Sequence, residues 1–120
     1  MSLKLEELDK TLRGKLLTDK TSRILYSTDA SAYKEMPMAV AIPENKEDLK
    51  KLIKFASDNK TSLIPRTAGT SLAGQVVGPG IVVDVSKHFT QVIDYNKEEK
   101  SITVEKYAAR SQLKLFNWAL

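Results

Sequence analysis

The feature that most constrains this chain is a cluster of glycines between two short apolar runs. Four of the five glycines fall in this one segment, at Gly69, Gly74, Gly78 and Gly80. The flanking runs, Ser62–Pro65 and Ile81–Val85, have the length and composition of buried β-strands. Glycine adopts left-handed backbone angles without steric cost and lets other groups approach the main chain closely. The segment is therefore predicted to be a tight loop between two strands.

The same loop carries groups that suit an anionic ligand. Successive amides in a glycine-bearing turn can converge on an anion, and the hydroxyls of Thr67, Thr70 and Ser71 add donors for phosphate oxygens. Arg66 adds a fixed positive charge. The loop is not a P-loop, because no Lys follows its glycines. It also differs from the Rossmann fingerprint, in which a helix follows the glycines, because the run after this loop is predicted to be a strand. The pattern alone leaves phosphate binding and a purely structural loop, whose hydroxyls cap its own backbone, equally open.

Leucines at intervals of three and four predict an amphipathic helix at the N-terminus. They stand at Leu5, Leu8, Leu12 and Leu16. Gly14 is expected to weaken the last turn of this helix, and residues 18–22 are expected to form its exit loop.

A strand and a second helix are predicted to follow. Met38–Ile42 is a compact apolar run closed by Pro43, which is typical of a buried strand. Asn45 can cap a helix that ends at Asn59, with Asp48 near the positive end of the helix dipole. The apolar stripe of this helix comprises Leu49, Leu52, Ile53 and Ala56.

Two β-type runs, Gln91–Tyr95 and Ser101–Glu105, flank a polar turn at residues 96–100 and are predicted to pair as an antiparallel hairpin. Helices and strands therefore mix without strict alternation along the chain. This order favours the α+β class, with a small mixed sheet flanked by helices.

Composition narrows the possible functions. The chain has no cysteine, so a disulfide framework, a thiolate metal site and a cysteine nucleophile are absent from its 120 residues, and no metal site is predicted. No apolar run reaches the roughly 20 residues of a membrane span, and a cytoplasmic location is expected. The net charge of +4 is spread evenly over both halves, so nucleic-acid binding is not predicted.

Three segments, taken in order, carry a resemblance to a known family. Residues 65–75 read PRTAGTSLAGQ, residues 28–33 read TDASAY with Pro37 and Pro43 after them, and residues 81–89 read IVVDVSKHF. They resemble three segments of the FAD-linked oxidases related to vanillyl-alcohol oxidase. Residues 65–75 resemble the pyrophosphate-binding loop, residues 28–33 the segment that opens the FAD domain, and residues 81–89 the strand after the loop. The second segment is similar to the branch that includes D-lactate and other 2-hydroxyacid dehydrogenases. The resemblance covers roughly residues 23–105.

The resemblance implies that the chain is the N-terminal part of an FAD-binding domain. Its parent protein would be a flavin-dependent dehydrogenase that oxidises a 2-hydroxyacid such as D-lactate or glycolate. The implied pyrophosphate-binding residues are Pro65, Arg66, Thr67, Ala68, Gly69, Thr70, Ser71, Gly74 and Gln75, and Pro43 would lie near the adenine. Some members attach FAD covalently through a His in this loop. Thr70 stands at the matching position here, so non-covalent FAD is expected, and no catalytic residue is named.

The motifs suggest three parts: a helical extension over residues 1–22, a partial FAD-binding domain over residues 23–105, and a divergent tail over residues 106–120. The tail ends on apolar side chains, so we expect a fragment of a longer protein with weak FAD affinity and no activity alone. The alternative is a non-catalytic interaction module that self-associates through residues 113–120.

Overall fold

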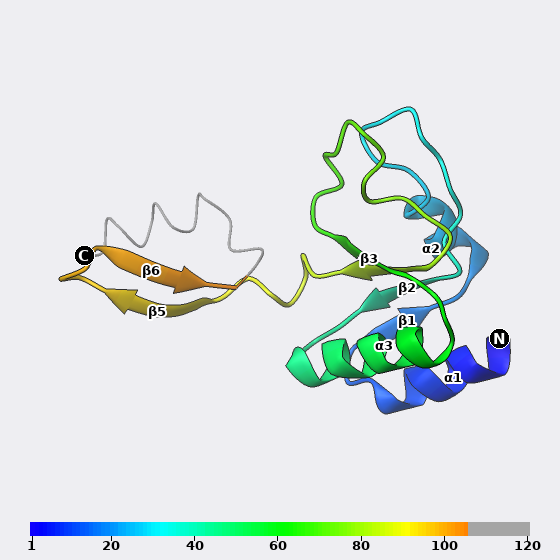
Figure 1. Cartoon of the computed structure of the whole chain (residues 1–120), viewed down its shortest axis with the longest axis horizontal. Coiled ribbons are helices and arrows are strands. Elements are labelled where there is room, and N and C mark those ends of the chain that lie inside the picture. Colours follow the sequence, from blue (N-terminus) through cyan, green and yellow to red (C-terminus); the bar gives the residue numbers. More distant parts are fainter. Residues whose placement is uncertain (106–120) are drawn as a thin grey trace.

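A four-stranded mixed sheet lies at the centre of the fold in the computed structural model, which describes residues 1–105 (Figure 1). The strand order is β1–β2–β4–β3. The strands are β1 (Lys15–Leu17), β2 (Ala39–Ile42), β3 (Leu63–Arg66) and β4 (Ile81–Asp84). Strands β2, β4 and β3 run parallel, whereas β1 is antiparallel to β2. Every residue of β2 and β4 is buried, as expected for the interior strands of a sheet covered on both faces.

Two helices, α1 (Ser2–Thr11) and α3 (Lys46–Asp58), lie side by side on one face of this sheet (Figure 1). Alternate strand residues point toward them. The core combines helix residues with one face of the strands, namely Leu5, Leu8, Leu52, Ala39, Ala41, Ile81 and Val83. The intervening Val40 and Val82 are also fully buried, so the opposite face of the sheet is covered as well. In Figure 1 the segment after α2 (Lys20–Leu25) and the β3–β4 loop lie over that opposite face.

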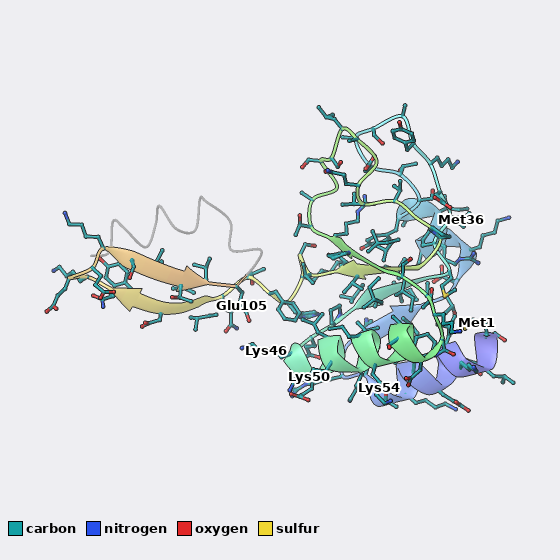
Figure 2. All side chains as sticks on the ribbon, in the orientation of Figure 1. Met1, Met36, Lys46, Lys50, Lys54 and Glu105 are labelled. Carbon is teal, nitrogen blue, oxygen red and sulfur yellow. The ribbon has the colours of Figure 1, made fainter. Side chains whose placement is uncertain are left out.

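The prediction for α3 is confirmed at both ends. The Asn45 side chain accepts a hydrogen bond from the Asp48 amide at 2.9 Å, and Asn59 ends the helix. Figure 2 shows Lys46, Lys50 and Lys54 along the outer side of this helix. The predicted apolar stripe is wrong at one position, because Ile53 is 60% exposed.

The N-terminal helix is shorter than the leucine spacing predicts. It ends at Thr11, and Leu16 is buried in β1 rather than on the helix stripe. The predicted exit loop at residues 18–22 is also wrong, because Asp19 caps α2 by accepting a hydrogen bond from the Ser22 amide. The helical description of residues 1–22 therefore needs correction, since β1 belongs to the central sheet.

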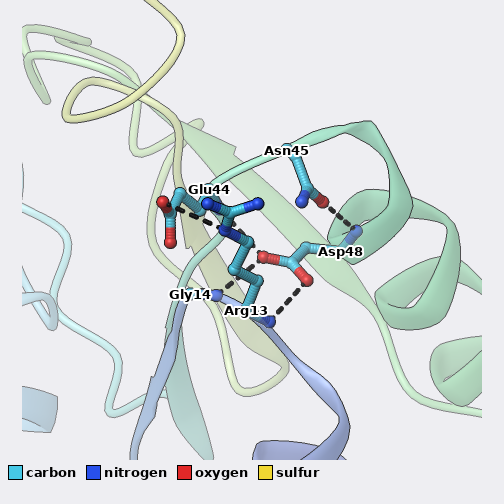
Figure 3. Close-up of polar contacts among 5 residues, drawn as sticks. All are labelled: Arg13, Gly14, Glu44, Asn45 and Asp48. Carbon is cyan, nitrogen blue, oxygen red and sulfur yellow. Dashed lines mark hydrogen bonds and ion pairs between the residues drawn. The ribbon is translucent and has the colours of Figure 1, made fainter.

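The Asp48 carboxylate is the physical reason why the chain turns before β1. It accepts hydrogen bonds from the amides of Arg13, Gly14 and Glu44 at 2.8, 2.8 and 2.9 Å (Figure 3). A Cβ on Gly14 would lie 2.1 Å from the carbonyl oxygen of Ile42. The turn into β1 thus depends on a long-range polar contact and on close backbone packing, neither of which leucine periodicity reports.

The predicted hairpin is confirmed as β5 (Val92–Asn96) and β6 (Ser101–Val104), which pair antiparallel. It forms a separate two-stranded sheet and projects away from the central sheet (Figure 1). Among residues 1–105, no helix has the length and apolar character needed to cross a membrane. The predicted tail at residues 106–120, with its self-association segment 113–120, lies outside the described residues.

Candidate functional site

The glycine-rich loop connects β3 to β4, as predicted, and two of its glycines need left-handed backbone. Gly69 has a φ angle of +67° and Gly74 one of +69°. Both also lie against another side chain. A Cβ on Gly69 would lie 2.5 Å from Nη2 of Arg66, and a Cβ on Gly74 would lie 2.6 Å from the Tyr33 ring. Any other residue at these positions would be strained by both its backbone angle and its contacts.

Within the loop, the hydroxyl groups have two different roles. Ser71 Oγ accepts hydrogen bonds from the amides of Ala73 and Gln75 at 3.2 and 3.3 Å and donates to the Gln75 side chain. Ser71 therefore caps its own turn, as the structural alternative predicted. Thr67 and Thr70 hydroxyls make no hydrogen bond within the described part of the chain, so they are the loop donors available to a ligand.

The segment TDASAY packs directly on this loop. The Ala30 amide donates to the carbonyl of Gly69 at 3.0 Å, and the Tyr33 ring covers Gly74. The structure therefore brings together two segments that are about 40 residues apart, and that the sequence linked only through a family resemblance.

Asp29, a half-buried residue, stabilises this segment and lies beside the loop. Its Oδ1 accepts hydrogen bonds from the amide and the hydroxyl of Ser31. The hydroxyl contact is the largest cause of a lowered Asp29 pKa. Burial opposes this effect, whereas the Val76 amide and the Arg66 charge lower the pKa further. Oδ2 is buried but has no hydrogen bond of normal geometry from the described residues.

The Arg66 side chain lies beneath the loop and points back toward the segment after α2. Nη1 donates to the carbonyl of Thr28 at 2.7 Å, and the guanidinium lies 5.2 Å from the centre of the Tyr26 ring. Tyr26 in turn donates its hydroxyl proton to Oδ2 of Asp84 at 2.5 Å. Asp84 is 4% exposed, and its Oδ1 accepts from the amide and hydroxyl of Ser86 at 2.8 and 2.6 Å.

Sequence reasoning missed Tyr26 and Asp84. Burial raises the pKa of Tyr26 to about 12, with the Asp84 contact as the next cause. Asp84 could have been found, because it is the one charged residue of an otherwise apolar buried strand. Tyr26 stands in a polar stretch without periodicity, and no sequence signal marks it.

The remaining predicted site residues differ in their exposure and in their position in the fold. Pro65 is an exposed residue of β3, and Ala68 and Gln75 are exposed in the loop. Pro43 is fully buried after β2, which β4 separates from β3. Residues 65–75 thus lie in one loop, whereas Pro43 follows a strand that is not a neighbour of β3, and an adenine contact for Pro43 stays a prediction.

The groups in this loop fit a pyrophosphate. No acidic residue occurs between Pro65 and Gly80, so the loop itself does not repel an anion. The nearby Asp29 lies close to the positive charge of Arg66. The Thr67 and Thr70 hydroxyls, which no residue in 1–105 engages, and the left-handed turns at two glycines complete an arrangement that is typical of phosphate binding.

Comparison with known proteins links this geometry to a family. The model of a family described as "FAD binding domain" matches residues 37–114. This range runs past residue 105, where the family resemblance described above ends, and the division of the chain into three parts stays a prediction.

Curated relatives match most of this chain but only a small part of their own length. D-2-hydroxyglutarate dehydrogenase of Escherichia coli (strain K12) is 35% identical over 113 residues, which are 91% of this chain and 11% of that protein. Glycolate oxidase subunit GlcD of Bacillus subtilis (strain 168) is 32% identical over 85 residues, covering 69% of this chain and 18% of the relative. The chain therefore spans between about a tenth and a fifth of these two relatives.

Solved structures share the fold at low sequence identity. Alkyldihydroxyacetonephosphate synthase superposes with a TM-score of 0.83 at 17% identity, over 99% of this chain and 25% of that one. The 4-ethylphenol oxidase from Gulosibacter chungangensis gives a TM-score of 0.76 at 15% identity, over 98% of this chain and 24% of that one. Both confirm the α+β arrangement of a small mixed sheet with flanking helices.

Proposed function

The chain belongs to the FAD binding domain family, and on this premise we propose that residues 65–75 hold the pyrophosphate of a non-covalently bound FAD. The observation that carries the proposal is the pair of left-handed glycines, Gly69 and Gly74, in a loop without acidic residues. Thr67 and Thr70 would donate their hydroxyl protons to phosphate oxygens. Thr70 offers no nucleophilic ring nitrogen, so it supports a cofactor held only by non-covalent contacts.

For the whole protein, we propose the oxidation of a 2-hydroxyacid. The relatives that match this chain are named D-2-hydroxyglutarate dehydrogenase, glycolate oxidase subunit and D-lactate dehydrogenase. FAD, when bound, would accept a hydride equivalent from the carbon that bears the substrate hydroxyl. The residues described here would contribute cofactor binding and orientation. We also propose the cytoplasmic location and the three-part division expected from the sequence, except that residues 1–22 contribute the strand β1 to the central sheet and are not a purely helical extension.

Isothermal titration of the 120-residue chain tests the proposed site. We expect weak binding of FAD and of ADP, with dissociation constants in the micromolar range or above, and no binding of riboflavin, which lacks the pyrophosphate. Thr70→Val should weaken binding of both nucleotides about tenfold, because a hydrogen bond to a charged group is lost. Thr18→Val, an exposed position outside the loop, is the matched control.

Three results would count against the proposal. Absence of FAD and ADP binding to the wild-type chain would refute a pyrophosphate site in these residues. Riboflavin binding as tight as FAD binding would place the cofactor contacts elsewhere. Unchanged affinity in both Thr70→Val and Gly69→Ala would show that the loop does not contact the ligand.

A further inference from the structure

We infer that Tyr26, held by Asp84, is a positioning residue for the FAD loop, and that Arg66 serves this loop as an internal support rather than as a phosphate ligand. This inference rests on the proposed function, because it names what shapes the proposed site. It concerns residues that lie beneath the loop.

Asp84 orients the phenol ring of Tyr26. The carboxylate is buried at the end of β4, and Ser86 occupies Oδ1 with two hydrogen bonds. Oδ2 accepts the Tyr26 hydroxyl proton at 2.5 Å. A short hydrogen bond to a charged oxygen is stronger than a neutral one, and it fixes the ring at both its backbone and its hydroxyl ends.

The ring then supports Arg66 from below. The guanidinium lies over the ring with 5.2 Å between Cζ and the ring centre. Nη1 donates to the carbonyl of Thr28 at 2.7 Å, and the carbonyl oxygen of Tyr26 lies 3.5 Å from the same nitrogen. One face and one edge of the guanidinium are therefore occupied by the protein itself.

Gly69 lies against the Nη2 and Nε atoms of the guanidinium. A Cβ at this position would lie 2.5 Å from Nη2 and 3.1 Å from Nε of Arg66, so the loop backbone rests on the arginine. The Gly69 carbonyl accepts the Ala30 amide at 3.0 Å. Arg66 thus links the ring of Tyr26, the Thr28 backbone and the left-handed turn of the loop.

These contacts separate two possible roles of Arg66. A phosphate ligand would present the edge of its guanidinium to solvent, where two donors can reach two oxygens. Here the guanidinium of the half-buried Arg66 is next to both an aromatic ring and a glycine, and its Nη1 is committed to a carbonyl. Its contribution to FAD binding would come from holding the loop in the binding shape before the ligand arrives, which lowers the ordering cost of binding.

The test combines FAD titration with amide and arginine Nε–H NMR spectra of the full 120-residue chain. Tyr26→Phe keeps the ring but removes the Asp84 contact, and Tyr33→Phe is the matched control at a tyrosine that is 64% exposed beside the same loop. We expect Tyr26→Phe to shift the Arg66 Nε–H and Gly69 amide signals and to weaken FAD binding about fivefold. Tyr33→Phe should do neither, and both variants should keep the wild-type circular dichroism spectrum.

Arg66→Lys separates support from charge. Lysine keeps the positive charge but lacks the planar fork, so we expect it to lose as much FAD affinity as Arg66→Met. The inference is overturned if Arg66→Lys binds FAD within twofold of wild type, or if Tyr26→Phe leaves both NMR signals in place.

Wild-type spectra decide the question even if a variant does not fold. On adding ADP, the Thr70 and Gly69 amide signals should move while the Arg66 Nε–H signal stays within its line width. A large movement of the Arg66 signal would identify it as a phosphate ligand and refute the inference. If ADP and FAD do not bind at all, the proposed function fails. The Arg66 and Gly69 signals in Tyr26→Phe then still show whether Tyr26 positions the loop.

Discussion

The carboxylate of Asp48 offers a direct test of what closes the N-terminal part of the fold. The side chain is completely buried and accepts three backbone hydrogen bonds, two at Oδ2 from Gly14 and Glu44 and one at Oδ1 from Arg13. In Asp48→Asn, the side-chain amide oxygen can keep the two hydrogen bonds from Gly14 and Glu44. The new NH₂ group would then face the Arg13 amide, so two donors would meet and that hydrogen bond would be lost.

The cost follows from these three contacts. One hydrogen bond to a charged acceptor is lost, which costs about 1.5–3 kcal/mol, and the other two become neutral and weaker. We therefore expect Asp48→Asn to lower the free energy of unfolding by about 3 kcal/mol. With a urea dependence of about 1.5 kcal/mol per molar for a domain of this size, the midpoint should fall by about 2 M.

The effect should also depend on pH. Burial raises the pKa of Asp48, but the amides of Glu44, Arg13 and Gly14 outweigh it, and the pKa of the folded state lies below the ordinary value. An Asp with a lowered pKa stabilises the fold above its unfolded pKa of about 3.9, and this stability is lost as the pH falls through the folded value. The difference in the free energy of unfolding between wild type and Asp48→Asn should therefore be largest at pH 7 and should shrink below about pH 4.

Urea unfolding followed by far-ultraviolet circular dichroism at pH 7 and pH 3 measures both effects. Asp58→Asn is the matched control, because Asp58 is on the same helix with an exposed ion pair to Lys54 and should cost less than about 0.5 kcal/mol. A midpoint change at Asp48 no larger than at Asp58 would refute the reasoning. The reasoning would also be refuted if the difference in the free energy of unfolding between wild type and Asp48→Asn were the same at both pH values.

Two further predictions test the packing described above. Gly14→Ala places a Cβ 2.1 Å from the Ile42 carbonyl oxygen, so a thermal melt should show destabilisation of about 2 kcal/mol or more. Gly78→Ala is the control and should cost less, because its Cβ meets only the end of the flexible Ile64 side chain. Tyr26 should keep its proton up to about pH 12, so stability that depends on it is complete below about pH 10 and is lost as the pH rises through about 12. Ultraviolet titration at 295 nm should lose its last step in Tyr26→Phe, and an unchanged titration curve would contradict the buried Tyr26–Asp84 contact.

Local signals were sufficient for much of this fold. The cap at Asn45, the buried run before Pro43 and the hairpin turn near residue 96 are encoded within a few residues, and all three are confirmed. The glycine loop was also found, because left-handed backbone strongly favours one residue type.

Long-range contacts explain what the sequence did not reveal. Leu16 continues the leucine spacing of α1, yet the Asp48 carboxylate holds Arg13 and Gly14, 35 and 34 residues away, and turns the chain into β1. The contact between Tyr26 and Asp84 spans 58 residues. Neither pairing leaves a local pattern, so the candidate loop could be predicted, whereas its supporting residues required the three-dimensional structure.

Strand β3 lies at one edge of the central sheet, and this position has a consequence for self-assembly. Within the described residues its one strand partner is β4, so the opposite edge of β3 is open to pairing. Pro65 stands in the middle of this four-residue strand and has no amide hydrogen to offer another chain. A residue assigned to the cofactor loop by family resemblance thus also protects the sheet edge against strand-by-strand aggregation.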